Sequence, residues 1–85
     1  MIEVTVAVNG QPTIVSPVGN ESLGSMLSRA MLQTGNLQYG PLDRWEARSR
    51  IGDLLDQELT WDWNSRVLLK NDLTIFLNLK PGLAA

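Results

Sequence analysis

Hydrophobic and polar side chains alternate over residues 2–8, at the start of the chain. A period of two is typical of a strand with one buried face. The apolar positions predicted to face the core are Ile2, Val4, Val6 and Val8. Asn9-Gly10 follows, and both residues accept the positive φ of a two-residue hairpin turn. A second strand is expected over residues 13–18, and Pro12 and Pro17 indicate that it lies at a sheet edge.

The apolar period then changes to that of a helix. Five apolar residues fall at i, i+3, i+4, i+7 and i+8 and therefore share one helical face. They are Leu23, Met26, Leu27, Ala30 and Met31. Asn20 or Ser22 can cap the start of this helix, and Gly35-Asn36 is a typical stop at its end. The pattern predicts an amphipathic helix, and we interpret its two methionines as ordinary core residues.

Two more alternating segments follow the helix. Residues 45–50 predict a strand that turns Trp45 and Ala47 inward. Its outward positions are Glu46, Arg48 and Arg50. Gly52-Asp53 predicts a turn into a short strand at Leu54-Leu55. Residues 74–80 predict the last strand. Its inward positions are Ile75, Leu77 and Leu79, and its outward positions are Thr74, Phe76 and Asn78.

An irregular region, residues 56–73, lies between these segments and contains one predicted helical turn over residues 60–64. Trp61 and Trp63 lie two positions apart, so at most one of them is expected at the centre of the core. We favour an interpretation in which both pack on the rim of the core. The alternative is one exposed tryptophan, which would be a candidate contact site.

The predicted order is strand, strand, helix, strand, short strand, strand, which is an α+β fold. The first and last strands are the most apolar, so we expect them to lie parallel at the sheet centre, with the helix in the crossover. The length of 85 residues, with 44% hydrophobic and 19% charged side chains, is typical of one small globular domain.

Composition limits the chemistry that the chain can perform. It contains no cysteine and no histidine, which excludes disulfides, a thiol nucleophile, a thiolate metal site and a serine–histidine triad. We therefore expect no enzyme, no cofactor and no resident metal. Carboxylates are paired at Asp53 with Asp56 and at Glu58 with Asp62. We interpret both pairs as solvated loops, with a weak divalent-cation site at the first pair as the alternative.

The net charge of −2 gives no electrostatic reason to expect nucleic acid or an anionic membrane as a partner. Only Glu3, Glu21 and Arg29 are charged within residues 1–40, so the second half supplies most of the charged surface. No apolar run reaches the roughly 20 residues that span a bilayer. Met1 leads into the first strand without a signal region, so we expect a cytoplasmic location.

Four segments of the chain resemble the small bacterial ubiquitin-like proteins that are encoded beside an activating enzyme, a conjugating enzyme and a JAB-type metallopeptidase. They are Thr34-Gly35-Asn36, Pro41-Leu42-Asp43-Arg44-Trp45-Glu46-Ala47-Arg48, Gly52-Asp53-Leu54-Leu55-Asp56 and Thr74-Ile75-Phe76-Leu77-Asn78-Leu79-Lys80-Pro81-Gly82. The resemblance implies a β-grasp (ubiquitin-like) fold, with a mixed sheet of four to five strands on one helix in the order ββαββ plus a short extra strand. The domain would span residues 1–80, and residues 81–85 would form an extended tail.

The resemblance further implies a protein modifier without a catalytic group of its own. A cognate activating enzyme would adenylate the terminal carboxylate and pass it to a cysteine as a thioester. A conjugating enzyme would then transfer it to an amine of a target protein as an isopeptide bond. The metallopeptidase is a further implied partner, and the family implies a role in bacterial anti-phage defence. The implied conjugation tail is Lys80, Pro81, Gly82, Leu83, Ala84 and Ala85.

This tail departs from the family, because Ala84 and Ala85 stand where a diglycine is usual. Each alanine adds a methyl group and disfavours positive φ. Three interpretations are open: partners that accept alanine, a pair that blocks processing or conjugation, or a non-covalent binding module or scaffold whose tail chemistry is lost. Cleavage after Gly82 is a minor alternative. Sulfur carriers share the fold and a reactive terminal carboxylate, but the middle of this chain resembles them less.

Outward side chains of the strands over residues 45–50 and 74–80 are the predicted partner-binding surface: Arg48, Arg50, Phe76 and Asn78. Such a charged and partly aromatic surface favours partners different from those of ubiquitin and affects partner choice more than raw affinity. The alternative is that both arginines belong to a solvated face. Pro12 and Pro17 weaken one exposed sheet edge, so we expect a monomer when the protein is free.

Overall fold

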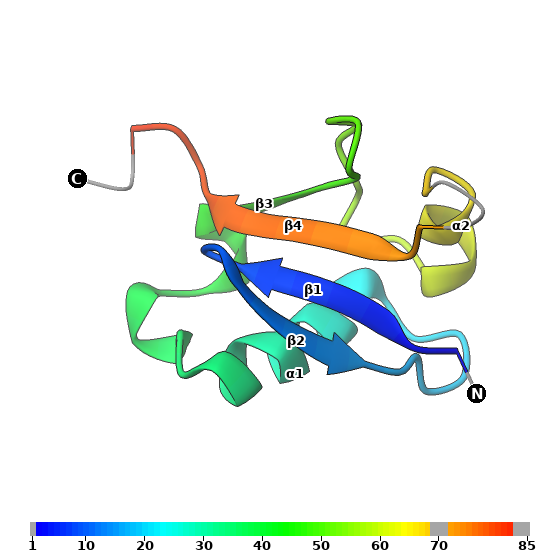
Figure 1. Cartoon of the computed structure of the whole chain (residues 1–85), viewed down its shortest axis with the longest axis horizontal. Helices are drawn as coiled ribbons and strands as arrows, with labels where there is room; N and C mark the ends of the chain where they lie inside the picture. The colour runs from blue at the N-terminus through cyan, green and yellow to red at the C-terminus, as the bar shows by residue number, and fades with distance from the viewer. Residues whose placement is uncertain (1, 69–71, 83–85) are drawn as a thin grey trace.

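Four strands form one mixed sheet in the computed structural model, which describes residues 2–68 and 72–82. The sheet order is β2-β1-β4-β3. The strands are β1 (Val4–Val8), β2 (Gln11–Val15), β3 (Trp45–Arg48) and β4 (Thr74–Leu79). β1 and β4 are parallel at the centre, as predicted, and each edge strand pairs antiparallel with its neighbour (Figure 1). The expected α+β class and mixed sheet are therefore confirmed.

The hairpin between β1 and β2 has the predicted two-residue turn. Asn9 and Gly10 have φ values of 50° and 84°, and Val8 pairs with Gln11 across them. Two details of the prediction are wrong. β1 begins only at Val4, so Ile2 is 51% exposed instead of facing the core. β2 ends at Val15 rather than at residue 18, because the backbone beyond it leaves the sheet to bind the helix.

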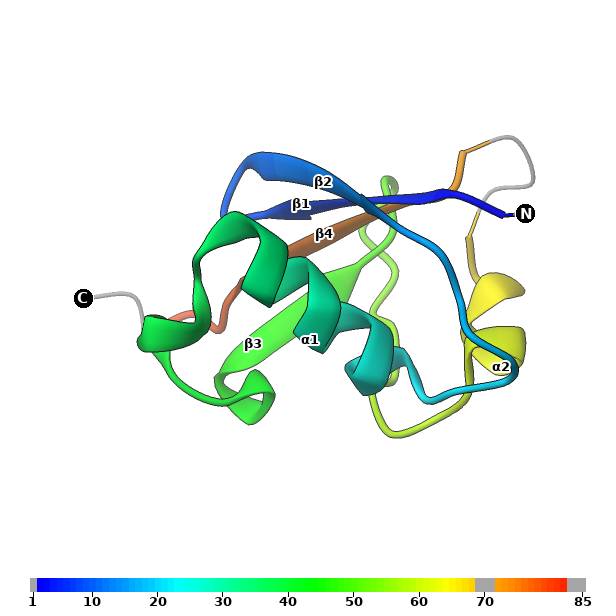
Figure 2. The ribbon, with the colours of Figure 1, turned by 90° about the horizontal axis from the view of Figure 1, so that it is seen from below.

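The helix α1 (Leu23–Thr34) lies across one face of the sheet, against β1 and β2 (Figure 2). The Ser22 side chain caps it by accepting the Ser25 backbone N–H at 3.2 Å. All five residues of its predicted apolar face are at most 1% exposed. The helix ends at Gly35, which has a φ of 72°. The Asn36 backbone N–H then donates to the Met31 carbonyl at 2.9 Å, which satisfies the end of the helix.

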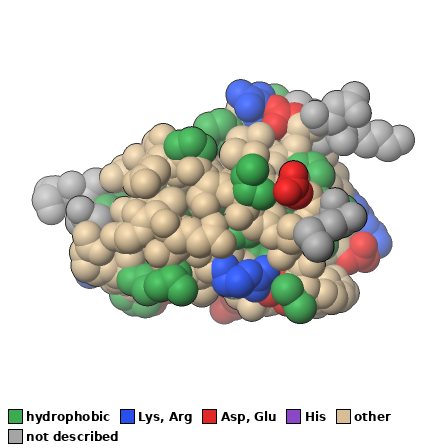
Figure 3. All heavy atoms as spheres, turned by 60° about the horizontal axis from the view of Figure 1, so that its bottom comes forward, with side chains coloured by type: hydrophobic (Ala, Val, Ile, Leu, Met, Phe, Trp, Pro, Cys, Tyr) green, Lys and Arg blue, Asp and Glu red, His purple; other side chains and the backbone are tan. Residues whose placement is uncertain are grey.

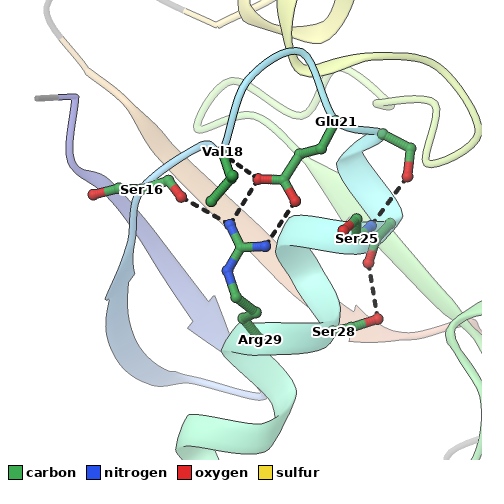
Figure 4. Close-up of polar contacts among 8 residues, drawn as sticks. Ser16, Val18, Glu21, Ser25, Ser28 and Arg29 are labelled. Atoms are coloured by element: carbon green, nitrogen blue, oxygen red, sulfur yellow. Dashed lines mark hydrogen bonds and ion pairs between the residues drawn. The ribbon is translucent and has the colours of Figure 1, made fainter.

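An ion pair joins the loop before α1 to the second turn of the helix (Figure 4). The Arg29 guanidinium donates to both carboxylate oxygens of Glu21 at 2.7 Å and to the Ser16 carbonyl at 2.8 Å. The Val18 backbone N–H donates to the same carboxylate at 2.6 Å. Hydrogen bonding to Arg29 lowers the pKa of Glu21 from 4.5 to about 2, and Glu21 raises the pKa of Arg29. The contact holds the chain where it passes from β2 into α1.

Two short 3-10 helices, η1 (Leu37–Tyr39) and η2 (Leu42–Arg44), lead into β3. In β3, Trp45 and Ala47 are fully buried, as predicted. The predicted short strand at Leu54-Leu55 is wrong, because only one bridge forms there, between Arg48 and Leu54. The Leu55 N–H donates to the Ala47 carbonyl at 2.8 Å. The Gln57 side chain, not the backbone, then donates to the Trp45 carbonyl at 2.9 Å, so regular pairing stops.

The predicted turn near residues 60–64 is a short helix, α2 (Trp61–Ser65), capped by the Thr60 side chain. Asn64 on this helix is fully buried and binds the loop beside it. Its Oδ1 accepts the Asp56 N–H at 2.8 Å, and its Nδ2 donates to the Asp56 and Thr60 carbonyls at 2.8 and 2.9 Å. A single amide side chain therefore organises the connection between β3 and α2.

The core fills the space between α1 and the sheet, and β4 contributes the fully buried Ile75 and Leu77, with Leu79 partly buried. On the side of β2 and α1, hydrophobic side chains form separate small spots among backbone atoms and uncharged polar side chains (Figure 3). This matches the scarcity of charge in residues 1–40. Within residues 2–68 and 72–82, no helix is long and apolar enough to cross a bilayer.

Candidate partner-binding surface and C-terminal tail

The pairing of β3 with β4 brings the predicted surface residues onto the sheet face opposite α1. Arg48 pairs with Phe76, and Glu46 pairs with Asn78. Ala47 and Leu77, which lie between these two pairs, point into the core. Because side chains alternate along a strand, their neighbours Glu46, Arg48, Phe76 and Asn78 point outward. Phe76 is half-buried and Asn78 is exposed. The sequence alone therefore identified the face, and the strand register shows which residues are neighbours.

Arg50 lies beyond the end of β3 but joins this face, because its guanidinium packs over the Phe76 ring, 5.6 Å from the ring centre. This is a cation–π distance. Arg50 also forms an ion pair with Asp72, which lies two positions before the start of β4. The pKa of Asp72 is lowered, first by a hydrogen bond to the Thr74 side chain and then by Arg50. Two contacts thus position the Arg50 side chain.

Arg48 is also held in place by its own neighbours. Its Nε donates to Glu46 at 3.1 Å, and its Nη1 donates to the Gly52 carbonyl at 2.7 Å. The second contact closes the turn that follows β3, in which the Gly52 N–H donates to the Ser49 carbonyl at 3.0 Å. Both arginines of the predicted surface therefore have carboxylate partners within the chain. The surface is charged and aromatic, but most of its positive charge is compensated locally.

The tail leaves the sheet at the end of β4 (Figure 1). The Lys80 N–H, directly after β4, donates to the Arg44 carbonyl at 2.9 Å. Pro81 and Gly82 are exposed, and Gly82 has a φ of 87° with nothing within 4 Å of an added Cβ. The remaining predicted tail residues, Leu83, Ala84 and Ala85, lie outside the described residues.

A groove of about 700 Å³ lies on the outer side of β3 and was not predicted. Its walls include Leu54 and Trp63, which are 59% and 45% exposed. Trp61 is 8% exposed, so the expectation that both tryptophans pack on the core rim is wrong. In a helix, positions i and i+2 point about 200° apart. The spacing of the two tryptophans, combined with the Thr60 cap, was the signal in the sequence that could have identified Trp63.

The acidic pairs of the sequence do not form a metal site in the part of the chain that the structure describes, where no three potential acidic ligands gather. Asp53 and Asp56 are both exposed and belong to the loop after β3. The Asp56 carboxylate accepts the Glu58 N–H at 3.0 Å, which is a local loop contact.

Comparison with known proteins adds a family but no activity. The family described as "Protein of Unknown function (DUF2604)" matches residues 1–85. A relative, the "Uncharacterized protein y4jI" of Sinorhizobium fredii (strain NBRC 101917 / NGR234), is 37% identical over 84 residues. The match covers 98% of this chain and 61% of the relative, so the chain spans less than two thirds of that protein.

Proposed function

The chain belongs to the DUF2604 family, and we propose that it is a ubiquitin-like protein modifier that reacts through its C-terminal carboxylate. The proposal includes a β-grasp assignment for the fold. It is supported by the parallel central strands β1 and β4, the antiparallel edge strands and the single long helix across one face (Figures 1 and 2).

The observation that carries the proposal is the way β4 ends. A central strand anchored by two fully buried side chains, Ile75 and Leu77, leads directly into the exposed Lys80, Pro81 and Gly82. A rigid strand followed by an exposed, narrow tail is what an enzyme needs to draw a terminal carboxylate into its active site. Gly82 supports this role, because the absence of a side chain allows another backbone to approach closely.

The proposed reaction uses no catalytic group of this chain. The terminal carboxylate would attack the α-phosphate of ATP in the activating enzyme and release pyrophosphate. A cysteine thiolate of that enzyme would displace AMP to form a thioester. After transfer to the conjugating enzyme, a target amine would displace the thiolate and leave an isopeptide bond. Cytoplasmic ATP would supply the energy, and the family resemblance adds anti-phage defence as the proposed setting.

The partners would recognise the face formed by Arg48, Arg50, Phe76 and Asn78. Fixed arginine side chains beside an aromatic ring offer directional hydrogen bonds at a low entropic cost, because their rotamers are already restricted. On binding, the ion pairs of Arg48 with Glu46 and of Arg50 with Asp72 would have to break, or each arginine would have to bind a partner carboxylate in addition to its own. The proposed surface therefore favours a partner that brings carboxylates of its own.

The test is mass spectrometry of the chain after incubation with ATP and with activating and conjugating enzymes of the kind that the resemblance implies. A variant with Ala84→Gly and Ala85→Gly provides the matched comparison. A thioester or target adduct on the native chain supports a modifier that uses an alanine tail. An adduct on the diglycine variant alone identifies the two alanines as a block. No adduct on either chain, with enzymes shown to be active, refutes the modifier.

A non-covalent ubiquitin-like binding module or scaffold is the second candidate. It is favoured by Trp63 and Leu54, which expose large apolar side chains at the groove beside β3. Exposed tryptophan is enriched among residues that dominate binding energies. Such a module would need no tail chemistry, so it would bind its partner with the tail alanines unchanged and without ATP.

A further inference from the structure

The groove beside β3 combines segments that are far apart in the sequence. Residues of η2, β3, the loop after β3 and α2 line it, together with Lys80 at the start of the tail. Its volume of about 700 Å³ is within the range of sites that hold a small ligand or several peptide side chains. By contrast, the side of β2 and α1 has only separate hydrophobic spots (Figure 3).

The apolar part of the groove is built around Trp63 and Leu54, which are 45% and 59% exposed. Trp45 and Leu55 also line the groove, but both are buried and belong to the core. These two buried side chains hold the walls of the groove in place, because Trp45 anchors β3 and Leu55 anchors the following loop to the core. A rigid pocket with an exposed tryptophan offers a large contact area without much loss of side-chain entropy.

The charged part of the groove is acidic. Four acidic residues line it, Asp43, Glu46, Asp56 and Glu58, against one basic residue, Lys80. Arg48 compensates Glu46. Within residues 2–68 and 72–82, no basic side chain forms an ion pair with the other three. The electrostatic potential of the groove therefore favours a cationic occupant.

The groove does not offer a strand edge. The Ala47 carbonyl on the outer side of β3 accepts the Leu55 N–H at 2.8 Å, and the Trp45 carbonyl accepts the Gln57 side chain at 2.9 Å. The chain thus covers this edge with its own residues. An occupant would have to bind through side chains, unlike a peptide that extends a sheet by backbone hydrogen bonds.

We propose that this groove binds a short basic segment of a partner protein that carries an aliphatic or aromatic anchor residue. The anchor packs on Trp63 and Leu54, and lysine or arginine side chains approach Asp43, Asp56 and Glu58. The Trp63 ring adds a face that attracts cations. Charge complementarity favours a basic peptide over nucleic acid, whose phosphates these carboxylates repel. The inference is independent of the tail chemistry, since it needs neither ATP nor an enzyme.

The experiment is a titration of the full chain followed by two-dimensional amide NMR, with the peptide acetyl-Lys-Lys-Leu-Lys-Leu-Lys-amide as the probe. We expect saturable shifts of the amides of residues 54–58 and of the Trp63 indole N–H. The same peptide with glutamate in place of lysine should produce none. Raising NaCl from about 0.05 M to about 0.5 M should weaken the binding several-fold, because rim ion pairs are screened over a few ångströms.

Matched variants locate the site. Glu58→Gln and Asp43→Asn should each weaken binding of the basic peptide by about threefold, as expected for a solvent-exposed ion pair. Trp63→Ala should weaken it more, since it removes the anchor contact. Glu3→Gln is the control, because this substitution also removes one negative charge and Glu3 does not line the groove. For each variant, an amide NMR spectrum without peptide that matches the native spectrum outside the substituted site would verify that the fold is intact.

Three results would overturn the proposal. If charge is the basis of recognition, the acidic peptide binds more weakly than the basic peptide, so equal binding of the two peptides refutes the proposal. Shifts that cluster outside the groove, or that do not saturate, refute the location. A third result concerns the tail: if deleting residues 83–85 shifts the groove amides without any peptide, the occupant is the tail of the chain itself and the partner assignment is wrong.

Discussion

Replacing Glu21 by glutamine tests the ion pair that joins the loop before α1 to the helix. The change removes the negative charge that the Arg29 guanidinium binds through two hydrogen bonds of 2.7 Å, and it keeps the size of the side chain. The pKa of Glu21 is lowered from 4.5 to about 2. At about 1.4 kcal/mol for each pKa unit, this sets an upper limit of about 3.5 kcal/mol on the stabilisation.

The expected effect is smaller than this limit. The Arg29 side chain is 36% exposed, so water screens the pair, and exposed pairs contribute less than about 1 kcal/mol. The Glu21 side chain is only 12% exposed and also accepts the Val18 N–H. Hydrogen bonds to charged groups contribute about 1.5–3 kcal/mol. Between these bounds, we expect Glu21→Gln to lower the free energy of unfolding by about 1–2 kcal/mol at neutral pH.

The pH dependence gives the sharper test. Because the folded-state pKa of Glu21 lies below its unfolded value, its stabilisation is complete above about pH 5 and is lost as the pH falls towards 2. The stability difference between the native chain and Glu21→Gln should therefore shrink over that window. Urea unfolding followed by tryptophan fluorescence measures it, with Glu3→Gln as a control that removes an exposed carboxylate. A difference that is absent at neutral pH, or that stays constant down to pH 2, would refute the reasoning.

Three further predictions use the same structure. Asn64→Leu should lower the free energy of unfolding by about 1–3 kcal/mol in urea unfolding, because the Asp56 backbone N–H loses its acceptor and the Asp56 and Thr60 carbonyls each lose one of their two donors; a neutral effect would contradict it. Gly35→Ala should lower the free energy of unfolding by only about 1 kcal/mol. An added Cβ meets no atom within 4 Å, so the only strain comes from the φ of 72°, which alanine disfavours. Lys80→Gln should strengthen binding of the basic probe peptide by about threefold, since it removes the one ammonium group of the groove; weaker binding would contradict the assigned charge preference.

Local patterns predicted the parts of the fold that depend on neighbours in the sequence. The apolar face of α1 and the Asn9-Gly10 turn follow from periodicity and backbone preference, and both are confirmed. Of the two candidate caps, Asn20 and Ser22, the structure shows Ser22 at the start of α1. Alternation also identified which side chains of β3 and β4 face outward. The errors fall where an element ends. Alternation continues through Ile2, but the pairing of β1 starts later, because a strand needs a partner and not only a pattern.

The groove could not be predicted in the same way, because its walls meet only in the folded chain. Leu54 looked like the start of a strand, yet the Gln57 side chain replaces the backbone donor that a strand would need. The register of β3 with β4 likewise decided that Phe76 stands opposite Arg48. Arg50 reaches the same ring from a turn, which no strand pattern predicts.

The two halves of the chain have different physical roles. Residues 1–40 carry only three charges, and two of these, Glu21 and Arg29, neutralise each other in one contact. This half supplies the long helix and the hairpin, and therefore much of the core. The arginine surface, the acidic groove and the tail all come from residues 41–85, where the remaining charges lie. Lys80 belongs to both the groove and the tail. An occupant of the groove would consequently contact the base of the tail, so that partner binding and tail access are physically linked whichever proposed function holds.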